Sequence, residues 1–362
     1  MCGRTCCNLS KDIYIKASCQ YNSAKACYET PQYKHLSNND MDYAPSINCT
    51  PQSITPVLIS SEHFKGESDV ANTLVPMLWG MIPPWHNGDY SNHGLSTNNC
   101  RLENWGLCEH FKGESDVANT LVPMLWGMIP PWHSGDYGNH GLSTNNCRLE
   151  NITSSKLYSP SLEQGKRCVV MCEGFYEWQT TKKTPKKQPY FVYATQSPGV
   201  QVESVTSWNS GEFTKEAGWR GPFLLYLAGV FNKWKHKEGD WIYSYSILTM
   251  EANDHFSWLH HRMPAVLSSE REVNEWLNYT AVSTGQALNM VKPVTSLQWH
   301  PVDHGVGNSR NKSDKCNVRI DLSKTMEGKS SQLMMSWLGR GSSGKREASS
   351  DEQNASKKQK PN

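Results

Sequence analysis

Long hydrophobic runs are missing from this 362-residue sequence. No apolar stretch approaches the roughly 20 residues that a membrane-spanning helix needs, and residues 1–20 contain no hydrophobic signal core. We therefore expect no membrane association. An excess of charge of one sign is missing too, because the formal net charge is only +2, so the total charge does not identify a partner.

Metal-binding spacings are also absent, although the sequence contains 12 cysteines. The closest groupings are Cys6 next to Cys7, and Cys168 with Cys172, and neither matches a zinc knuckle. Without a secretory leader, this pattern is typical of free thiols in a reducing compartment. We therefore expect neither a metal nor any other cofactor.

The first residues carry an unusual pair of reactive groups. Removal of Met1, which a small second residue permits, leaves Cys2 with a free α-amine and a thiol. The pKa values of these groups are near ~8 and ~8.5, so both are partly reactive at neutral pH. Such a cysteine can attack an acyl group, or condense with an aldehyde and close to a thiazolidine. Alternatively, Cys2 is simply the second residue of the chain.

A duplication interrupts the first half of the sequence. Residues 62–104 and 109–151 are nearly identical, with a period of 47 residues, and differ only at Asn87/Ser134 and Ser91/Gly138. Two copies are too few for a solenoid, in which each repeat packs on its neighbours. One copy is therefore predicted to loop out of a single domain.

The flanking sequence favours the second copy as the one that folds into the domain. Residues 154–162, which follow it, have the pattern of a short amphipathic helix. The first copy is followed by Trp105-Gly106-Leu107-Cys108, which would interrupt such a helix. A junction inside the repeat, which would combine strands of both copies, remains the alternative.

The remaining pattern predicts an α+β fold. One short helix is expected within residues 5–50, and further helices at 269–278 and 283–291. The β-branched and aromatic stretches predict a mainly antiparallel, barrel-like curled sheet with a few peripheral helices, in which 188–195 and 221–245 form a meander. Strands are predicted at 53–60, 121–132, 168–172, 190–193, 224–231 and 241–249.

Polar residues among the predicted strands form several islands, and each has an ordinary structural alternative. Glu177 could be an exposed strand residue, and His260 with His261 could be a surface pair, since no third zinc ligand is suitably spaced. Asn146 could be a turn residue. The arginines of these islands could be plain surface charges; they are Arg4, Arg148 and Arg262.

Taken together, the islands resemble the SOS-response-associated peptidase family. That family carries six motifs in a fixed order, and this sequence has all six over about residues 2–320, apart from the duplicated insert. They are Met1–Arg4, Trp126–Trp132, Asn146–Glu150, Gly174–Trp178, His260–Pro264 and Gly307-Asn308. The resemblance implies one family domain at 2–322, with the Ser/Lys/Gln/Gly-rich residues 323–362 as a disordered tail.

The resemblance also implies an activity. Members of the family bind single-stranded DNA and link covalently to abasic sites through the N-terminal cysteine, a lyase-like reaction that forms a thiazolidine. The resemblance implies a monomer that needs no cofactor. An autopeptidase that cleaves the Met1-Cys2 bond with the Cys2 thiol, and a non-covalent reader of modified cytosine, are the alternatives.

Residue roles follow from the motif positions. Glu177 would shuttle protons near the Cys2 amine, His260 would donate to the sugar O4′ as the ring opens, and Asn146 (duplicate Asn99) would orient Cys2. The three arginines, with Arg101 as the duplicate of Arg148, would hold flanking phosphates. Trp126 and Trp132 would either stack on bases or belong to the core.

The tail carries two further patterns. Lys345-Arg346 and Lys357–Lys360 resemble a bipartite nuclear localisation signal, which predicts a nuclear, chromatin-associated protein at replication forks. Gln332–Leu338 is a degenerate match to the motif that docks on sliding clamps, although an amphipathic helix that closes the domain would have the same pattern. A solvated tail without either function is the alternative.

Overall fold

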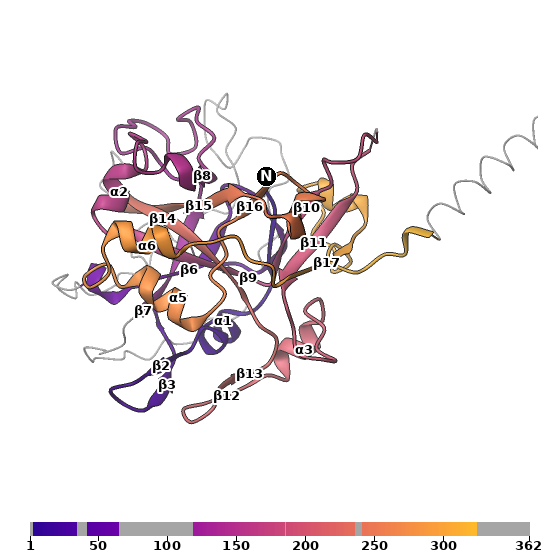
Figure 1. Ribbon diagram of the computed structural model, residues 1–362, viewed down its shortest axis with the longest axis horizontal. Coiled ribbons are helices and arrows are strands. Elements are labelled where there is room, and N and C mark those ends of the chain that lie inside the picture. Colours follow the sequence, from indigo (N-terminus) through magenta and orange to yellow (C-terminus); the bar gives the residue numbers. More distant parts are fainter. Residues whose placement is uncertain (1–2, 35–41, 65–118, 185, 236–240, 324–362) are drawn as a thin grey trace, which may run out of the picture. The chain divides into compact units, whose positions relative to one another are not determined.

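A computed structural model describes residues 3–34, 42–64, 119–184, 186–235 and 241–323 of the chain (Figure 1). By its contacts the chain divides into two units, residues 1–319 and 320–362. All elements described below up to residue 307 belong to the first unit, and the tail patterns at 332–338 and 345–360 lie outside the described residues.

The centre of the first unit is a closed five-stranded barrel. Its strands are β6 (Ile54–Ser60), β7 (Asn119–Trp126), β9 (Arg167–Cys172), β14 (Leu225–Lys235) and β15 (Trp241–Glu251). Neighbours pair antiparallel in the order β15-β14-β9-β6-β7, and a parallel pairing of β7 with β15 closes the ring. The predicted barrel-like, mainly antiparallel sheet and the α+β class are confirmed.

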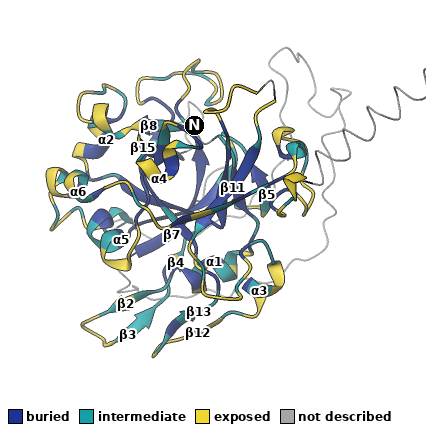
Figure 2. Cartoon of the chain, turned by 45° about the vertical axis from the view of Figure 1, so that its right-hand side comes forward, coloured by how far each residue is buried: buried dark blue, intermediate teal, exposed yellow. Residues whose placement is uncertain are grey.

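The barrel strands are buried on both faces, as Figure 2 shows by their dark blue colour. Every residue of β7 and of β9 is buried, and β15 is buried except at its two ends. A strand covered on both faces needs apolar residues at consecutive positions instead of alternating ones. This agrees with the largely apolar sequences of β7 and β9.

A second sheet lies beside the barrel and contains the N-terminal segment. Its order is β17 (Leu297–Pro301), β11 (Pro189–Ala194), β10 (Gly174–Trp178), β1 (Thr5–Cys7) and β5 (Ser46–Cys49). The predicted meander of 188–195 with 221–245 is therefore wrong. β11 pairs with β10 and β17 in this sheet, whereas β14 and β15 pair with each other in the barrel.

Smaller strands extend the two sheets. β8 (Asn146–Arg148) and β16 (Arg262–Pro264) flank one end of β15, and β4 (Gln32–Tyr33) pairs with β7. Two hairpins stand apart, and the sequence analysis did not predict them. They are β2 (Gln20–Asn22) with β3 (Cys27–Glu29), and β12 (Glu212–Thr214) with β13 (Gly218–Arg220).

Short helices cover the periphery. α5 (Glu270–Leu277) begins at the N-cap Ser269, and its Trp276 donates from Nε1 to the Cys168 carbonyl of β9 at 2.9 Å. α6 (Thr284–Met290) begins with a capping box of Ser283 and Gln286. The others are α1 (Lys11–Ala17), α2 (Ser159–Glu163), α3 (Val205–Asn209) and α4 (Asp254–Ser257), with 3₁₀ turns η1 (Ser61–Phe64), η3 (Leu149–Asn151) and η4 (His304–Gly307).

The described parts of the duplicated segment come from both copies. Glu62, His63 and Phe64 of the first copy form most of η1, whereas β7 and β8 come from the second copy. The equivalents of β7 and β8 in the first copy lie within 65–118, outside the described residues. Both described strands of the duplicated segment thus belong to the second copy, the one that the flanking sequence favoured, and the first copy contributes residues 62–64 to the described structure.

Candidate functional site

Two of the sequence motifs meet around the end of one barrel strand. Arg148 of β8 and Pro264 of β16 are both register partners of Thr249 in β15, on opposite edges of that strand. The labels of β8, β15, β16 and β10 accordingly lie close together along the upper side of Figure 1. The topology therefore gathers the motifs at 146–150 and 260–264, which are far apart in the sequence.

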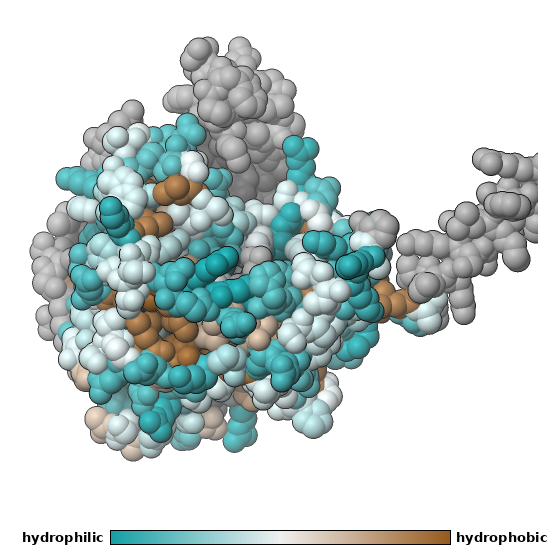
Figure 3. Space-filling view, turned by 45° about the horizontal axis from the view of Figure 1, so that its top comes forward, coloured by the Kyte–Doolittle hydropathy of each residue, from teal (hydrophilic) through white to brown (hydrophobic). Residues whose placement is uncertain are grey.

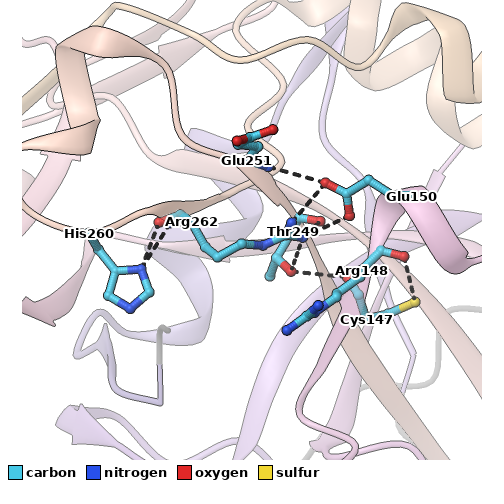
Figure 4. A network of polar contacts seen from close by, with 7 residues as sticks. All are labelled: Cys147, Arg148, Glu150, Thr249, Glu251, His260 and Arg262. Atoms are coloured by element: carbon cyan, nitrogen blue, oxygen red, sulfur yellow. Dashed lines mark hydrogen bonds and ion pairs between the residues drawn. The ribbon is translucent and has the colours of Figure 1, made fainter. Parts of the chain in front are cut away.

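Arg262 and Glu150 form a two-pronged ion pair beside this strand, drawn in Figure 4. The Arg262 guanidinium donates to both carboxylate oxygens of Glu150, at 2.8 and 2.9 Å, and to the Thr249 carbonyl at 2.7 Å. Burial acts to raise the pKa of Glu150, but the hydrogen bond and the charge of Arg262, together with backbone hydrogen bonds from Glu150 and Glu251, outweigh it, and the net pKa is lowered. Arg262 therefore locks β16 to β15 and to the turn that follows β8.

His260 lies next to this ion pair and is only 7% exposed. Its Nδ1 accepts the backbone N–H of Arg262 at 3.0 Å, and its ring stacks on that of His261. Burial, and then the positive charge of the amino terminus, lower the pKa of His260 to about 4. The ring is therefore neutral at pH 7, and its Nδ1 lies between the N–H and the carbonyl oxygen of Arg262, at 3.0 and 3.2 Å.

The start of the described chain runs along the strand that carries Glu177. β1 pairs antiparallel with β10, with Thr5 opposite Phe175, and the Tyr176 N–H donates to the Arg4 carbonyl at 2.9 Å. Glu177 is 5% exposed, and its Oε1 accepts the Trp178 N–H at 3.2 Å. Continued by two residues, this register brings Gly3 opposite Glu177.

The end of β10 also reaches the histidine motif. The Thr180 N–H donates to the Leu259 carbonyl at 2.9 Å, and Gln179 donates from Nε2 to the Trp258 carbonyl at 3.3 Å. The residues directly before His260 are thus fastened to the residues directly after Glu177. The Glu177 and His260 motifs are therefore neighbours in the structure.

Arg4 ties the first motif to the last one. Its guanidinium donates to the carbonyls of Val306 and Gly307, at 3.0 and 2.9 Å, and to Asn48 Oδ1 at 2.9 Å. Asn48 is fully buried and donates onward to the Val306 and Asn308 carbonyls. The sequence analysis missed Asn48, because nothing in its local pattern distinguishes it from a turn residue.

The other predicted DNA-contacting residues differ in exposure. Arg148 is exposed and makes no ion pair with any described residue. Trp132 is 60% exposed, in the loop between β7 and β8. Trp126 is fully buried, and its Nε1 donates to the Asn145 carbonyl, so it belongs to the core and is removed from the stacking candidates.

Asn146 lies at the start of β8, opposite Ile247 of β15, and its carbonyl accepts the Tyr158 hydroxyl at 3.3 Å. Cys2, Asn99 and Arg101 lie outside the described residues. Figure 3, in which the top of Figure 1 comes forward, shows hydrophilic side chains among near-neutral ones, with a hydrophobic patch below them.

The described residues hold no group of three or more His, Cys, Asp or Glu side chains that could bind a metal. All nine cysteines among them are free thiols. Within the same residues, no helix has the length and apolar character that crossing a membrane requires.

Comparisons with known proteins agree with the motif pattern. The family model described as SOS response associated peptidase (SRAP) matches residues 1–115 and 107–309. The chain is 34% identical over 343 residues to abasic site processing protein HMCES of Rattus norvegicus, covering 93% of this chain and 82% of that protein. The protein of the same name from Xenopus tropicalis is 33% identical over 350 residues, covering 93% and 85%.

More distant relatives match a shorter part of the chain. Abasic site processing protein YedK of Escherichia coli is 26% identical over 162 residues, which cover 44% of this chain and 59% of that protein. A crystal structure of a protein from Bordetella bronchiseptica superimposes with a TM-score of 0.48 at 15% identity, covering 83% of this chain and 100% of that one.

Proposed function

The chain belongs to the SOS response associated peptidase family, and from this premise we propose that it processes abasic sites in single-stranded DNA by forming a covalent link through Cys2. The names of its relatives support the substrate class. One structural observation supports the chemistry: hydrogen bonds connect the start of β1, the end of β10, the loop before His260 and the Arg262–Glu150 pair into one continuous site.

The proposed reaction begins after loss of Met1. The Cys2 α-amine adds to C1′ of the ring-opened abasic sugar, and water leaves as the imine forms. The thiolate sulfur then bonds to C1′, the imine nitrogen takes up a proton, and a thiazolidine results. Met1 must be removed first, because an amide nitrogen cannot form the imine. Cleavage of the Met1-Cys2 bond by the Cys2 thiol itself is part of the proposal.

Acid–base assistance in this scheme is assigned to two residues. Glu177, buried opposite the start of β1, would take the proton from the amine and return one as water leaves. His260, with a neutral ring, would assist ring opening by donating a hydrogen bond from Nε2 to O4′ of the sugar, and water would supply the proton; its Nδ1 faces the Arg262 N–H. Asn146 would orient the sugar and Cys2 from the edge of β15.

Direct contact with a phosphate is assigned to one arginine, Arg148. Arg148 is exposed without an ion pair among the described residues, so its guanidinium suits a phosphate oxygen. Arg262 and Arg4 already donate to protein acceptors and would contribute mainly positive potential. The exposed Trp132 is the candidate for stacking on a base. The basic clusters of the tail extend the proposal to the nucleus, and Gln332–Leu338 to sliding clamps at replication forks.

A crosslinking assay with a matched pair of variants tests this proposal. On a denaturing gel, the protein should form a covalent band with a single-stranded oligonucleotide that contains one abasic site, and none with the intact oligonucleotide. Asn146→Ala should reduce the band at least tenfold, because Asn146 lies in the site, whereas Asn99→Ala, at the same position of the other copy, should not. The reverse pattern would refute the assignment of Asn146.

A further inference from the structure

A second glutamate, Glu173, lies directly before β10 and is not part of the site described above. It is 2% exposed, and three donors from the N-terminal segment converge on its carboxylate. Oε1 accepts the Asn8 N–H at 2.7 Å and the Cys6 thiol at 3.7 Å. Oε2 accepts the Tyr14 hydroxyl of α1. The carboxylate thus fastens β1, the residue after it and α1 to one point.

The strand that Glu173 fastens is short. β1 has only three residues, and its pairing with β10 consists of Thr5 opposite Phe175 and Cys6 opposite Gly174. On its other edge, the pairing with β5 is irregular between Thr5 and Cys7. All three residues are buried, so a shift by one residue would exchange the side chains between the two faces and move the chain end by about 3.3 Å.

Backbone geometry strengthens the link between Glu173 and β1. The Glu173 N–H donates to the Cys6 carbonyl at 3.1 Å, so backbone and side chain of Glu173 hold the same residue. The next residue has to be glycine, because a Cβ at Gly174 would lie 2.5 Å from both the Phe191 ring and the Val192 carbonyl oxygen. β10 therefore packs tightly against β11 at the point where it holds β1.

We propose that Glu173 is a positioning residue whose negative charge fixes the register of β1, so that the N-terminal nucleophile is aligned with Glu177 only when Glu173 is ionised. This inference rests on the proposed function. Two of the three donors can bond only to an acceptor oxygen; they are the Asn8 N–H and the Cys6 thiol. A proton on Oε2 makes the Tyr14 hydroxyl turn and accept, and the bonds from Asn8 and Cys6 to Oε1 lose the assistance of the negative charge.

Glu173 changes its protonation state within a pH range in which the reaction can be measured. Burial, only partly offset by the hydrogen bond from Tyr14, raises the pKa of Glu173 to about 7. The titratable groups that face Glu173 come from every element around it. They are Cys6 and Cys7 of β1, Tyr14 of α1, Tyr43, Cys49 of β5, Cys172 of β9 and Tyr176 of β10, with Glu203 and Asp314 lining the adjoining small cavity.

Most of these neighbours keep one protonation state near pH 7. Burial raises the pKa of Cys6, Tyr14 and Tyr176 well above the ordinary values, as it does for Tyr43. The exception is Cys49, whose pKa is lowered by a hydrogen bond from Cys7. A change in charge near pH 7 in this cluster therefore belongs to Glu173 or to Cys49, and its loss in Glu173→Gln assigns it to Glu173.

Ionisation of Glu173 should change the stability of the fold and the crosslinking rate in opposite directions. Because the folded pKa of about 7 exceeds that of an unfolded glutamate, the contribution of Glu173 to stability is complete at low pH and is lost as pH rises to about 7. The crosslinking rate should instead rise over the same range as the carboxylate aligns β1. The two readouts therefore separate positioning from folding.

The test compares single-turnover crosslinking rates between pH 5.5 and 8.5, using an abasic oligonucleotide and three variants. Glu173→Gln imitates the protonated group, so the ratio of wild-type to variant rate should be near one at pH 5.5 and rise to about fivefold at pH 8, as charge-assisted hydrogen bonds are about twice as strong as neutral ones. Tyr14→Phe removes a donor that lowers the pKa, and should move the wild-type rate step to higher pH.

The partly exposed Glu275 of α5 provides the matched control, and Glu275→Gln should give a ratio that does not vary with pH. A constant ratio for Glu173→Gln would overturn the proposal, since a purely structural defect lowers the rate equally at every pH. Should that variant fail to fold, an unmoved step in Tyr14→Phe would overturn it instead. A wild-type protein without any adduct, at every pH, would contradict the proposed function itself.

Discussion

Arginines that look equivalent in the sequence have different partners in the structure. Arg148 is exposed on β8, whereas the Arg262 guanidinium donates to Glu150 and to the Thr249 carbonyl. A phosphate can approach Arg148 without displacing a protein contact, but it has to compete with a carboxylate at Arg262. The two side chains should therefore respond differently to mutation.

Arg148→Ala should weaken binding to single-stranded DNA and reduce the slope of log affinity against log salt by about 0.7, the value for one phosphate contact. Its unfolding free energy should change by less than about 0.5 kcal/mol. Arg262→Ala should destabilise the fold by about 2 kcal/mol, because a hydrogen-bonded, partly buried ion pair is lost. Salt-dependent binding and denaturant unfolding measure both effects. Equal salt slopes for Arg148→Ala and the wild type would contradict the role of Arg148.

His260 is expected to be neutral across the physiological range. Its pKa is lowered to about 4, first by burial, so the unfolded chain binds a proton there between pH 6.5 and 4 that the folded chain does not. The stabilising effect of the neutral ring is therefore present above pH 6.5 and is lost as pH falls to about 4. NMR titration of the His260 ring should give a midpoint near 4. A midpoint at 6 or above would show a protonatable, solvated ring.

At the scale of elements, the connection between β6 and β7 carries the duplication. Ser60 and Asn119 are register partners in an antiparallel pair, so the chain leaves and re-enters the sheet at the same place. The strands need only a short connection there. The 47-residue repeat is thus an addition between two positions that the sheet already holds together.

Deletion of residues 65–111 should preserve the fold, because it joins Phe64 to Lys112 and restores one uninterrupted copy of the repeat. The connection becomes about fivefold shorter, which should stabilise the protein by about 1.5 kcal/mol through the lower entropy cost of loop closure. Thermal unfolding measures the change. Deletion of residues 167–213 serves as the control of equal length, and it should abolish folding because it removes the unduplicated strands β9, β10 and β11. Loss of folding in the first deletion would contradict this view of the insert.

The sequence predicted those elements whose patterns are local. The strands at β6, β9, β11, β14 and β15, and the helices α5 and α6, were confirmed, since their apolar runs and N-caps lie within single segments. The division into two sheets was not predictable in this way, because the pairing of β1 with β10 joins residues about 170 positions apart. The short hairpins β2–β3 and β12–β13 were missed, as three-residue strands give too little periodicity.

The candidate site shows the same limit. Motif matching placed Glu177, His260, Asn146 and Arg262 in one site, and the structure brings the elements that carry them together. It did not separate the buried Trp126 from the exposed Trp132, because both lie in the same aromatic stretch. It also did not reveal Asn48, Glu150 or Glu173 as partners, since each contacts residues more than 100 positions away.

For the whole molecule, the central claim is that the mature N-terminus is the nucleophile, which intact-mass measurement tests most directly. Purified protein should have a mass that lacks Met1 and should gain the mass of one abasic oligonucleotide, less one water, after mixing. Cys2→Ala, which leaves the described residues unchanged, should show no such gain. A folded wild-type protein that lacks Met1 and gains no mass, or a Cys2→Ala variant that gains it fully, would contradict the account.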